Sequence, residues 1–209
     1  YDLLLFQHIA SLHLTCVDAN ESMLKQTSDY LRSHQVTNFK TLLATAETFP
    51  LEDGSMDGLM TFNAIHHFDF VRFVERAAQA VDQENGRIFI YTRSATQNSR
   101  NIWGEYFPEF ADRETRLYEM DEMEGMIQSL DGVRLDTAIS FKYGRTAPLD
   151  HLVEKALARN YSTFSLYDED ELDLAVGTFQ RNIQDAFDDP AQVEWFDENL
   201  LLTLSPDPY

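Results

Sequence analysis

The chain has 209 residues, of which 44% are hydrophobic, so it is long enough to bury a sizeable core. Its formal net charge is -20, from 36 acidic against 16 basic residues. Nucleic-acid affinity comes mainly from neutralising phosphates with Lys and Arg, so this balance argues against a nucleic-acid partner and against an anionic membrane surface.

The chain has a single cysteine, Cys16, which excludes an intrachain disulfide and a cysteine metal cluster. Because Cys16 lies in an apolar run, we expect a buried and inert thiol. No stretch is long and apolar enough to cross a bilayer. The sequence begins at Tyr1 without a basic leading region or an initiator methionine, so we expect a cytoplasmic protein whose first residue lies inside a longer chain.

Strand-like and helix-like segments alternate as far as Ser94. Apolar residues at helical spacing predict helices, and Asn20 is a suitable cap for the second of them. Short apolar runs bounded by turn residues predict strands. The predicted helices are 3–12, 20–31 and 70–81, and the predicted strands are 12–18, 39–46, 58–64 and 87–94. This alternation predicts an α/β fold, with a parallel sheet and helices on both faces.

Beyond Ser94 the pattern changes. The segment 98–116 is aromatic and irregular. The helix predicted at 169–187 is strongly acidic, and we expect it to present a solvated face. The further predictions are helices at 119–130, 149–160 and 169–187 and strands at 133–143 and 194–204. Since the chain has no repeats and no obvious linker, we expect one domain, 1–209, with cap or lid insertions around 97–118 and 147–190.

In open parallel sheets, ligands bind at the carboxyl ends of the strands. Asp18 ends one predicted strand and could accept hydrogen bonds from both hydroxyls of a ribose, or it could be an ordinary capping carboxylate. At the next strand end, a backbone N–H of Ala46 or Glu47 could reach an adenine nitrogen. Met23 would then form an apolar wall, although an ordinary turn with Met23 in the core explains the same residues.

The third strand end carries Asn63, His66 and His67. A histidine at this position could act as a base or orient a nucleophile, although packing or cofactor contact is the more frequent role. Adjacent side chains diverge and no further ligand is near in sequence, so the two histidines make a poor metal site. We therefore predict no metal.

Together these stretches resemble the class I methyltransferases that use S-adenosylmethionine, and specifically the type 11 group, which acts mostly on small molecules. The resemblance is carried by LHLTCVDANESML (12–24), ATAETFPLEDGSMDGLMTFNAIHHF (44–68) and FVERAAQAVDQENGRIFIYTR (73–93). It implies a Rossmann-like fold with antiparallel C-terminal strands, and S-adenosylmethionine as the cofactor. The residues that it implies for cofactor binding are Asp18, Ala19, Met23, Thr45, Ala46, Glu47, Asn63 and Ala64.

Two features depart from the family. The glycine-rich loop, which should precede the first helix, is absent together with the first strand, and the sequence begins at Tyr1 immediately after it. Without that segment the sheet would lose its central strand, and we expect cofactor binding to fail. In addition, Thr45 stands where relatives often carry an Asp for the adenine amine, which weakens that contact.

The resemblance implies methyl transfer to a small-molecule acceptor by in-line displacement. The sulfonium is already activated, so the protein mainly aligns the acceptor and excludes water. If the acceptor must lose a proton, His67 is the candidate base. Weaker candidates are His66, Arg93, Tyr106 and Tyr143, and the aromatic segment 103–110 could form a lid or a structural cap.

Two other functions stay open. A nicotinamide-dependent oxidoreductase also places an acid after its second strand, but the sequence shows no Tyr-Lys or metal motif for such chemistry. A non-catalytic interaction module could keep the fold without the glycine loop. The methyltransferase hypothesis requires that Asp18, Ala46–Glu47 and Asn63 line one crevice.

Overall fold

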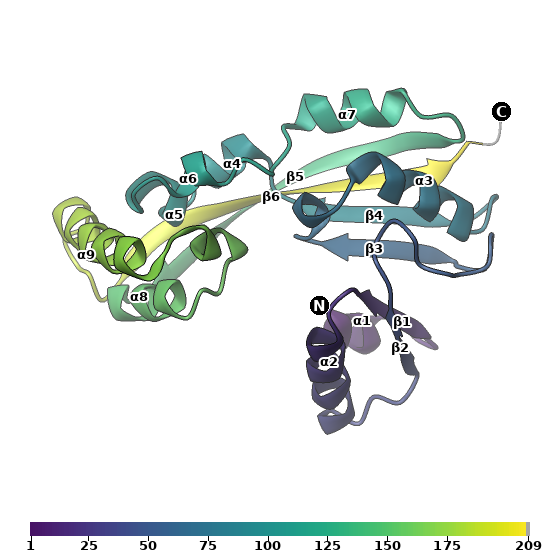
Figure 1. Ribbon diagram of the computed structural model, residues 1–209, viewed down its shortest axis with the longest axis horizontal. Coiled ribbons are helices and arrows are strands. Elements are labelled where there is room, and N and C mark those ends of the chain that lie inside the picture. Colours follow the sequence, from purple (N-terminus) through teal and green to yellow (C-terminus); the bar gives the residue numbers. More distant parts are fainter. Residues whose placement is uncertain (208–209) are drawn as a thin grey trace.

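The computed structural model describes residues 1–207, and its parallel strands form two sheets rather than the single sheet predicted. β1 (Leu14–Asp18) and β2 (Phe39–Leu43) pair in parallel as a two-stranded sheet. α1 (Asp2–His8) and α2 (Glu21–Ser33) lie beside it (Figure 1). Within residues 1–207 no strand pairs with both this sheet and the rest of the molecule, which is why the predicted sheet is divided.

The second sheet has four strands. β3 and β4 run parallel, whereas β6 runs antiparallel to both of its neighbours. The strands, in spatial order, are β3 (Gly58–Phe62), β4 (Arg87–Thr92), β6 (Val193–Pro206) and β5 (Val133–Ala147). The predicted α/β class and the antiparallel C-terminal strands are therefore confirmed.

α3 (Phe70–Ala80) and α7 (Met120–Gln128) pack on one face of the four-stranded sheet (Figure 1). Successive side chains of a strand point to opposite faces, so Ile88 and Ile90 of β4 are fully buried under these helices. The other face, which we call the outer face, carries partly exposed apolar side chains. Phe141, for example, keeps 39% of its surface accessible.

A second core lies over the opposite half of β5 and β6. Its centre is Trp103, whose ring centroid is 5.2 Å from that of Phe164 and 5.2 Å from that of Phe179. The helices around it are α5 (Ile102–Tyr106), α6 (Phe110–Arg113), α8 (Leu149–Leu157) and α9 (Glu169–Ala186), with the short helix η2 (Ser162–Leu166). We call this group the helical cap; it lies to one side of the sheet in Figure 1.

Local sequence signals explain several element boundaries. The Asn20 side chain accepts hydrogen bonds from the N–H groups of Ser22 and Met23, which confirms the predicted cap of α2. The irregular segment 98–116 contains α5 and α6, and α4 (Ala95–Ser99) begins just before it. No helix among residues 1–207 is long and apolar enough to cross a membrane.

Candidate functional site

Asp18 is the last residue of β1, with its carboxylate at the carboxyl end of that strand. Its Oδ1 accepts a hydrogen bond from the N–H of Asn20 at 2.7 Å, which fixes the orientation of the carboxylate. Within residues 1–207, no group donates a hydrogen bond to Oδ2. One carboxylate oxygen is therefore held by the chain, and the other is available to a hydroxyl group. Ala19 follows in an exposed position.

The second strand end is formed by the turn after β2. Glu47 accepts a hydrogen bond from the N–H of Asp69, and Thr45 Oγ1 lies 2.8 Å from Thr48 Oγ1. Burial alone would raise the pKa of the Glu47 carboxyl, but hydrogen bonds from the backbone of Asp69, from its own backbone and from the Thr45 side chain together outweigh burial, so this pKa is lowered. The Ala46 side chain packs against the core beneath α3.

Met23 lies on the first turn of α2, with 47% of its surface exposed. The alternative that placed Met23 in the core is therefore wrong. An exposed thioether side chain near the end of β1 can supply an apolar wall for a planar ring, as the resemblance to the methyl-transfer family implies. That role stays a prediction.

Asn63 follows β3 directly and has a φ of 48°, in the left-handed region that Asn tolerates better than most residues. Its backbone N–H donates to the Tyr91 carbonyl at 2.7 Å. Its side chain accepts from Asn199 Nδ2 and donates to the Tyr1 hydroxyl, both at 3.4 Å. The next residue, Ala64, caps the short helix η1 (Ile65–His67).

The three strand ends are linked through the backbone rather than directly. The Asp18 carbonyl accepts a hydrogen bond from Ala44, which ties the end of β1 to the turn that contains Glu47. Glu47 in turn is bonded to Asp69, at the start of α3. Within residues 1–207 no hydrogen bond joins Asp18 to Asn63, so the single crevice stays a prediction.

His66 and His67 form η1, with their ring centroids 4.0 Å apart. His67 is exposed, and partial burial lowers its pKa. His66 is more buried, and loss of solvation lowers its pKa to about 4. Its Nε2 lies 3.3 Å from Ser162 Oγ in the helical cap, and its buried Nδ1 has no hydrogen-bond partner within residues 1–207. Both rings are therefore neutral near pH 7.

A polar network on the outer face contains two residues that sequence reasoning missed, Tyr91 and Asn199. The Tyr91 and Tyr143 hydroxyls are 2.8 Å apart, and the Tyr143 hydroxyl donates to Asn199 Oδ1 at 2.6 Å. Asn199 also reaches Asn63, as described above. Only the pairing of β6 with both β4 and β5 brings these residues together, so no sequence motif indicates the network.

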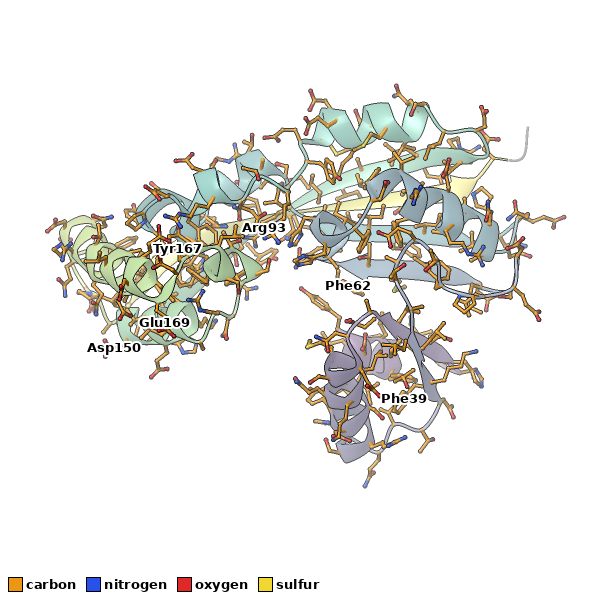
Figure 2. The ribbon with its side chains drawn as sticks, in the orientation of Figure 1. Phe39, Phe62, Arg93, Asp150, Tyr167 and Glu169 are labelled. Atoms are coloured by element: carbon orange, nitrogen blue, oxygen red, sulfur yellow. The ribbon has the colours of Figure 1, made fainter. Side chains whose placement is uncertain are left out.

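Two of the weaker base candidates differ in position. Arg93 lies where the sheet meets the helical cap (Figure 2), and its Nη2 is 3.9 Å from Asp197 Oδ1. Tyr106 lies in the cap, where its ring packs near Phe187 and its carbonyl accepts a hydrogen bond from Asn182. Arg93 is therefore near the outer-face network, and Tyr106 belongs to the cap.

Comparison with known proteins adds the following. Residues 3–90 match the family model described as a methyltransferase domain. No curated protein matches the chain in sequence.

Three solved structures illustrate the likeness. A protein of Anabaena variabilis, assigned as a methyltransferase of an antibiotic biosynthesis pathway, has a TM-score of 0.66 at 16% identity, over 96% of this chain and 85% of its own. A protein of Bacillus halodurans, also assigned as a methyltransferase, has a TM-score of 0.63 at 16% identity, over 93% and 83%. Geranyl diphosphate methyltransferase, solved with S-adenosylmethionine, has a TM-score of 0.58 at 9% identity, over 99% and 73%. Identities this low show a shared fold.

Proposed function

We propose that this chain is a class I S-adenosylmethionine-dependent methyltransferase that transfers the methyl group of the cofactor to a small molecule. Residues 3–90 match the methyltransferase-domain model. The observation that carries the proposal is the free Oδ2 of Asp18 at the end of β1, within the matched segment. A strongly acidic chain favours a small acceptor over a nucleic acid.

The residues at the strand ends fit the adenosyl part of the cofactor. The free oxygen of Asp18 can accept a hydrogen bond from a ribose hydroxyl, and the exposed Met23 can cover a ring face. Within residues 1–207 no hydrogen bond engages the N–H of Ala46, so it can donate to a ring nitrogen. Asn63 and Ala64 would lie beside the methionine part.

When bound, the cofactor supplies a methyl group on a sulfonium. An acceptor that took up this group would have to release a proton to a residue of the chain. The chain's own part is to align the acceptor and exclude water. His67, which is neutral and exposed, is the residue we propose to take that proton.

The helical cap is the part of the chain that we propose to cover the acceptor. Its aromatic segment around Trp103 begins soon after Arg93, the residue that follows β4, so the cap is connected to the carboxyl end of that strand. The acceptor would then lie between the outer face and the cap.

Calorimetric titration of the full-length protein with S-adenosylmethionine, and separately with NAD, tests the proposal. We expect heat of binding with S-adenosylmethionine and none with NAD. Binding of NAD alone would favour the oxidoreductase, and binding of neither would favour a non-catalytic module. If the chain binds the methyl donor, a screen of small-molecule acceptors then tests transfer directly.

A further inference from the structure

The hydrogen bonds of the outer-face network have one fixed donor-to-acceptor direction, which a backbone carbonyl determines. Asn199 is 1% exposed, and its Nδ2 lies 3.2 Å from the carbonyl oxygen of Thr92. A carbonyl oxygen can only accept a hydrogen bond, so the nitrogen of the Asn199 amide must face it and Oδ1 must point the other way. Asn199 Oδ1 therefore accepts, and the Tyr143 hydroxyl donates to it at 2.6 Å.

This direction determines the bond between the two tyrosines. A tyrosine hydroxyl has one proton, and that of Tyr143 is used on Asn199. The 2.8 Å contact between the hydroxyls must then be a bond from Tyr91 to Tyr143. The Tyr91 proton is also used, so the Tyr91 oxygen keeps only lone pairs. A ligand that binds there must donate a hydrogen bond.

The surroundings of Tyr91 are aromatic. Its ring centroid is 6.1 Å from that of Phe62 and 6.4 Å from that of Phe141, both on the outer face. Figure 2 shows Phe62 on β3, next to the strand end that carries Asn63. The ring of Tyr1 already stacks here, with its centroid 4.3 Å from that of Phe62 and 6.2 Å from that of Tyr91. The face therefore suits a planar ligand with one polar group that takes the place of this ring.

The charged groups nearby are paired with one another. Asp197 Oδ2 accepts from Arg145 Nε at 3.1 Å, and its Oδ1 accepts from Trp195 Nε1 at 3.2 Å and lies 3.9 Å from Arg93. One carboxylate, Asp197, thus faces two guanidinium groups, so this cluster beside the network keeps a net charge of about +1.

We propose that Tyr91 and Tyr143, oriented by Asn199, bind the hydroxyl or amine group of the methyl acceptor, an aromatic molecule that donates its hydrogen bond to the Tyr91 oxygen. This rests on the proposed function, because it names the acceptor class of the same site. The link from Asn199 to Asn63 connects this group to the residue proposed to lie beside the methionine part of the cofactor.

Tyr91 positions the acceptor and does not remove its proton. Burial and the contact with Tyr143 raise the pKa of the Tyr91 hydroxyl, so it remains protonated at neutral pH. The hydrogen bond that the acceptor donates to Tyr91 leaves a lone pair of the acceptor pointing away from the network. That lone pair can attack the methyl group. A hydroxyl acceptor has a single proton, the one it shares with Tyr91, so that proton passes to a separate base only after the methyl group has bonded.

The test uses two probes that differ only in the donor: 4-methylphenol, and 4-methylanisole, in which a methyl ether replaces the hydroxyl. Both are titrated by NMR into the 209-residue protein, with and without S-adenosylmethionine. We expect 4-methylphenol to bind about five- to tenfold more tightly, the factor that one neutral hydrogen bond supplies. Tyr91→Phe should bring the ratio to within about twofold, with binding of 4-methylanisole unchanged.

Tyr143→Phe makes a sharper test of direction. It removes the acceptor of the Tyr91 proton, so Tyr91 becomes free to donate, and 4-methylanisole should bind more tightly than it does to the wild type. Tyr30→Phe, on α2, is the control and should keep the wild-type ratio, because its ring lies beside His34 and outside the network.

Equal affinities in the wild type, an unchanged ratio in Tyr91→Phe, or no binding of either probe would each overturn the inference. Thermal unfolding shows whether a variant has folded, and unchanged binding of 4-methylanisole to Tyr91→Phe shows that its site is intact. If the proposed function fails, calorimetry shows no binding of S-adenosylmethionine. The ratio of the affinities for the two probes is also measured without the cofactor, so it does not depend on that result.

Discussion

The carboxylate of Glu47 accepts a hydrogen bond from the backbone N–H of Asp69, with 3.0 Å between Oε1 and N. Asp69 is also the N-cap of α3, where its own side chain accepts from the N–H of Arg72. The turn after β2 and the start of α3 are therefore joined by one charge-assisted bond. This contact ties the small two-stranded unit to the four-stranded sheet.

Replacing this carboxylate should loosen the junction. We expect Glu47→Ala to lower the free energy of unfolding by about 1 kcal/mol, the usual contribution of an exposed hydrogen bond to a charged group. Urea unfolding followed by circular dichroism measures it. Glu52→Ala, an exposed glutamate of the same loop with no side-chain hydrogen bond in the described structure, is the control and should stay within about 0.5 kcal/mol of the wild type. Equal losses in the two variants would contradict the role of Glu47.

Asp18 should determine cofactor affinity more than stability. Asp18→Asn keeps an oxygen for the N–H of Asn20 but removes the charge, so we expect the Kd for S-adenosylmethionine to rise about tenfold while the fold is retained. Calorimetric titration measures the change. The control is Asp29→Asn on α2, whose carboxylate pairs with Lys25 in solvent. An unchanged Kd for Asp18→Asn would remove Asp18 from the cofactor site.

The first half of the fold could be predicted because its signals are local. Asn20 caps α2 through its own side chain, and the short apolar run of β4 forms a strand in which buried and half-buried residues alternate. The two-sheet arrangement could not be predicted in this way. Strand pairing depends on which strands are neighbours. The residues of β1 and β3 predict ordinary strands whether or not another strand lies between them.

The residues of the candidate site differ in the same way: some could be predicted from the local sequence, and others only from strand pairing. Asp18, Glu47 and Asn63 follow strands and could be found by position alone. Tyr91 and Asn199 are separated by more than a hundred residues and meet only through the register of β4 with β6, in which Tyr91 pairs with Leu201. β5 extends to Ala147, beyond its predicted end at Tyr143, because much of it is an exposed edge strand in which burial imposes no alternation.

The helical cap should depend on its aromatic core. Phe179 of α9 is 0% exposed, and its ring packs against Trp103 and Phe107. We expect Phe179→Ala to lower the free energy of unfolding by about 3–5 kcal/mol, because it removes a buried ring and leaves a cavity. The control on the same helix is Leu174→Ala, since Leu174 is 74% exposed and should cost less than about 0.5 kcal/mol. Chemical denaturation of the two variants checks this, and similar losses would contradict the core assignment.

His66 should make the protein less stable as the pH falls. Burial lowers its folded-state pKa from 6.5 to about 4; His67 and the guanidinium groups of Arg116 and Arg93 add to this effect, and Glu114 opposes it. Between these two pH values the unfolded chain binds a proton that the folded chain does not, so the free energy of unfolding decreases as the pH falls through the window. Above pH 6.5 the ring is neutral in both states and this dependence disappears.

Thermal unfolding of the wild type and of His66→Gln between pH 7.5 and 4.5 tests this dependence. Carboxylates also titrate at the acidic end, so the comparison rests on the difference between the two proteins at each pH. We expect the Tm of His66→Gln to fall less steeply below pH 6.5, because glutamine cannot take up the proton. His8→Gln, at an exposed position in α1, should follow the wild-type curve. Parallel curves for the wild type and His66→Gln would mean that His66 does not carry the acid sensitivity. The contact between η1 and Ser162 of the helical cap would then be independent of the charge on this ring.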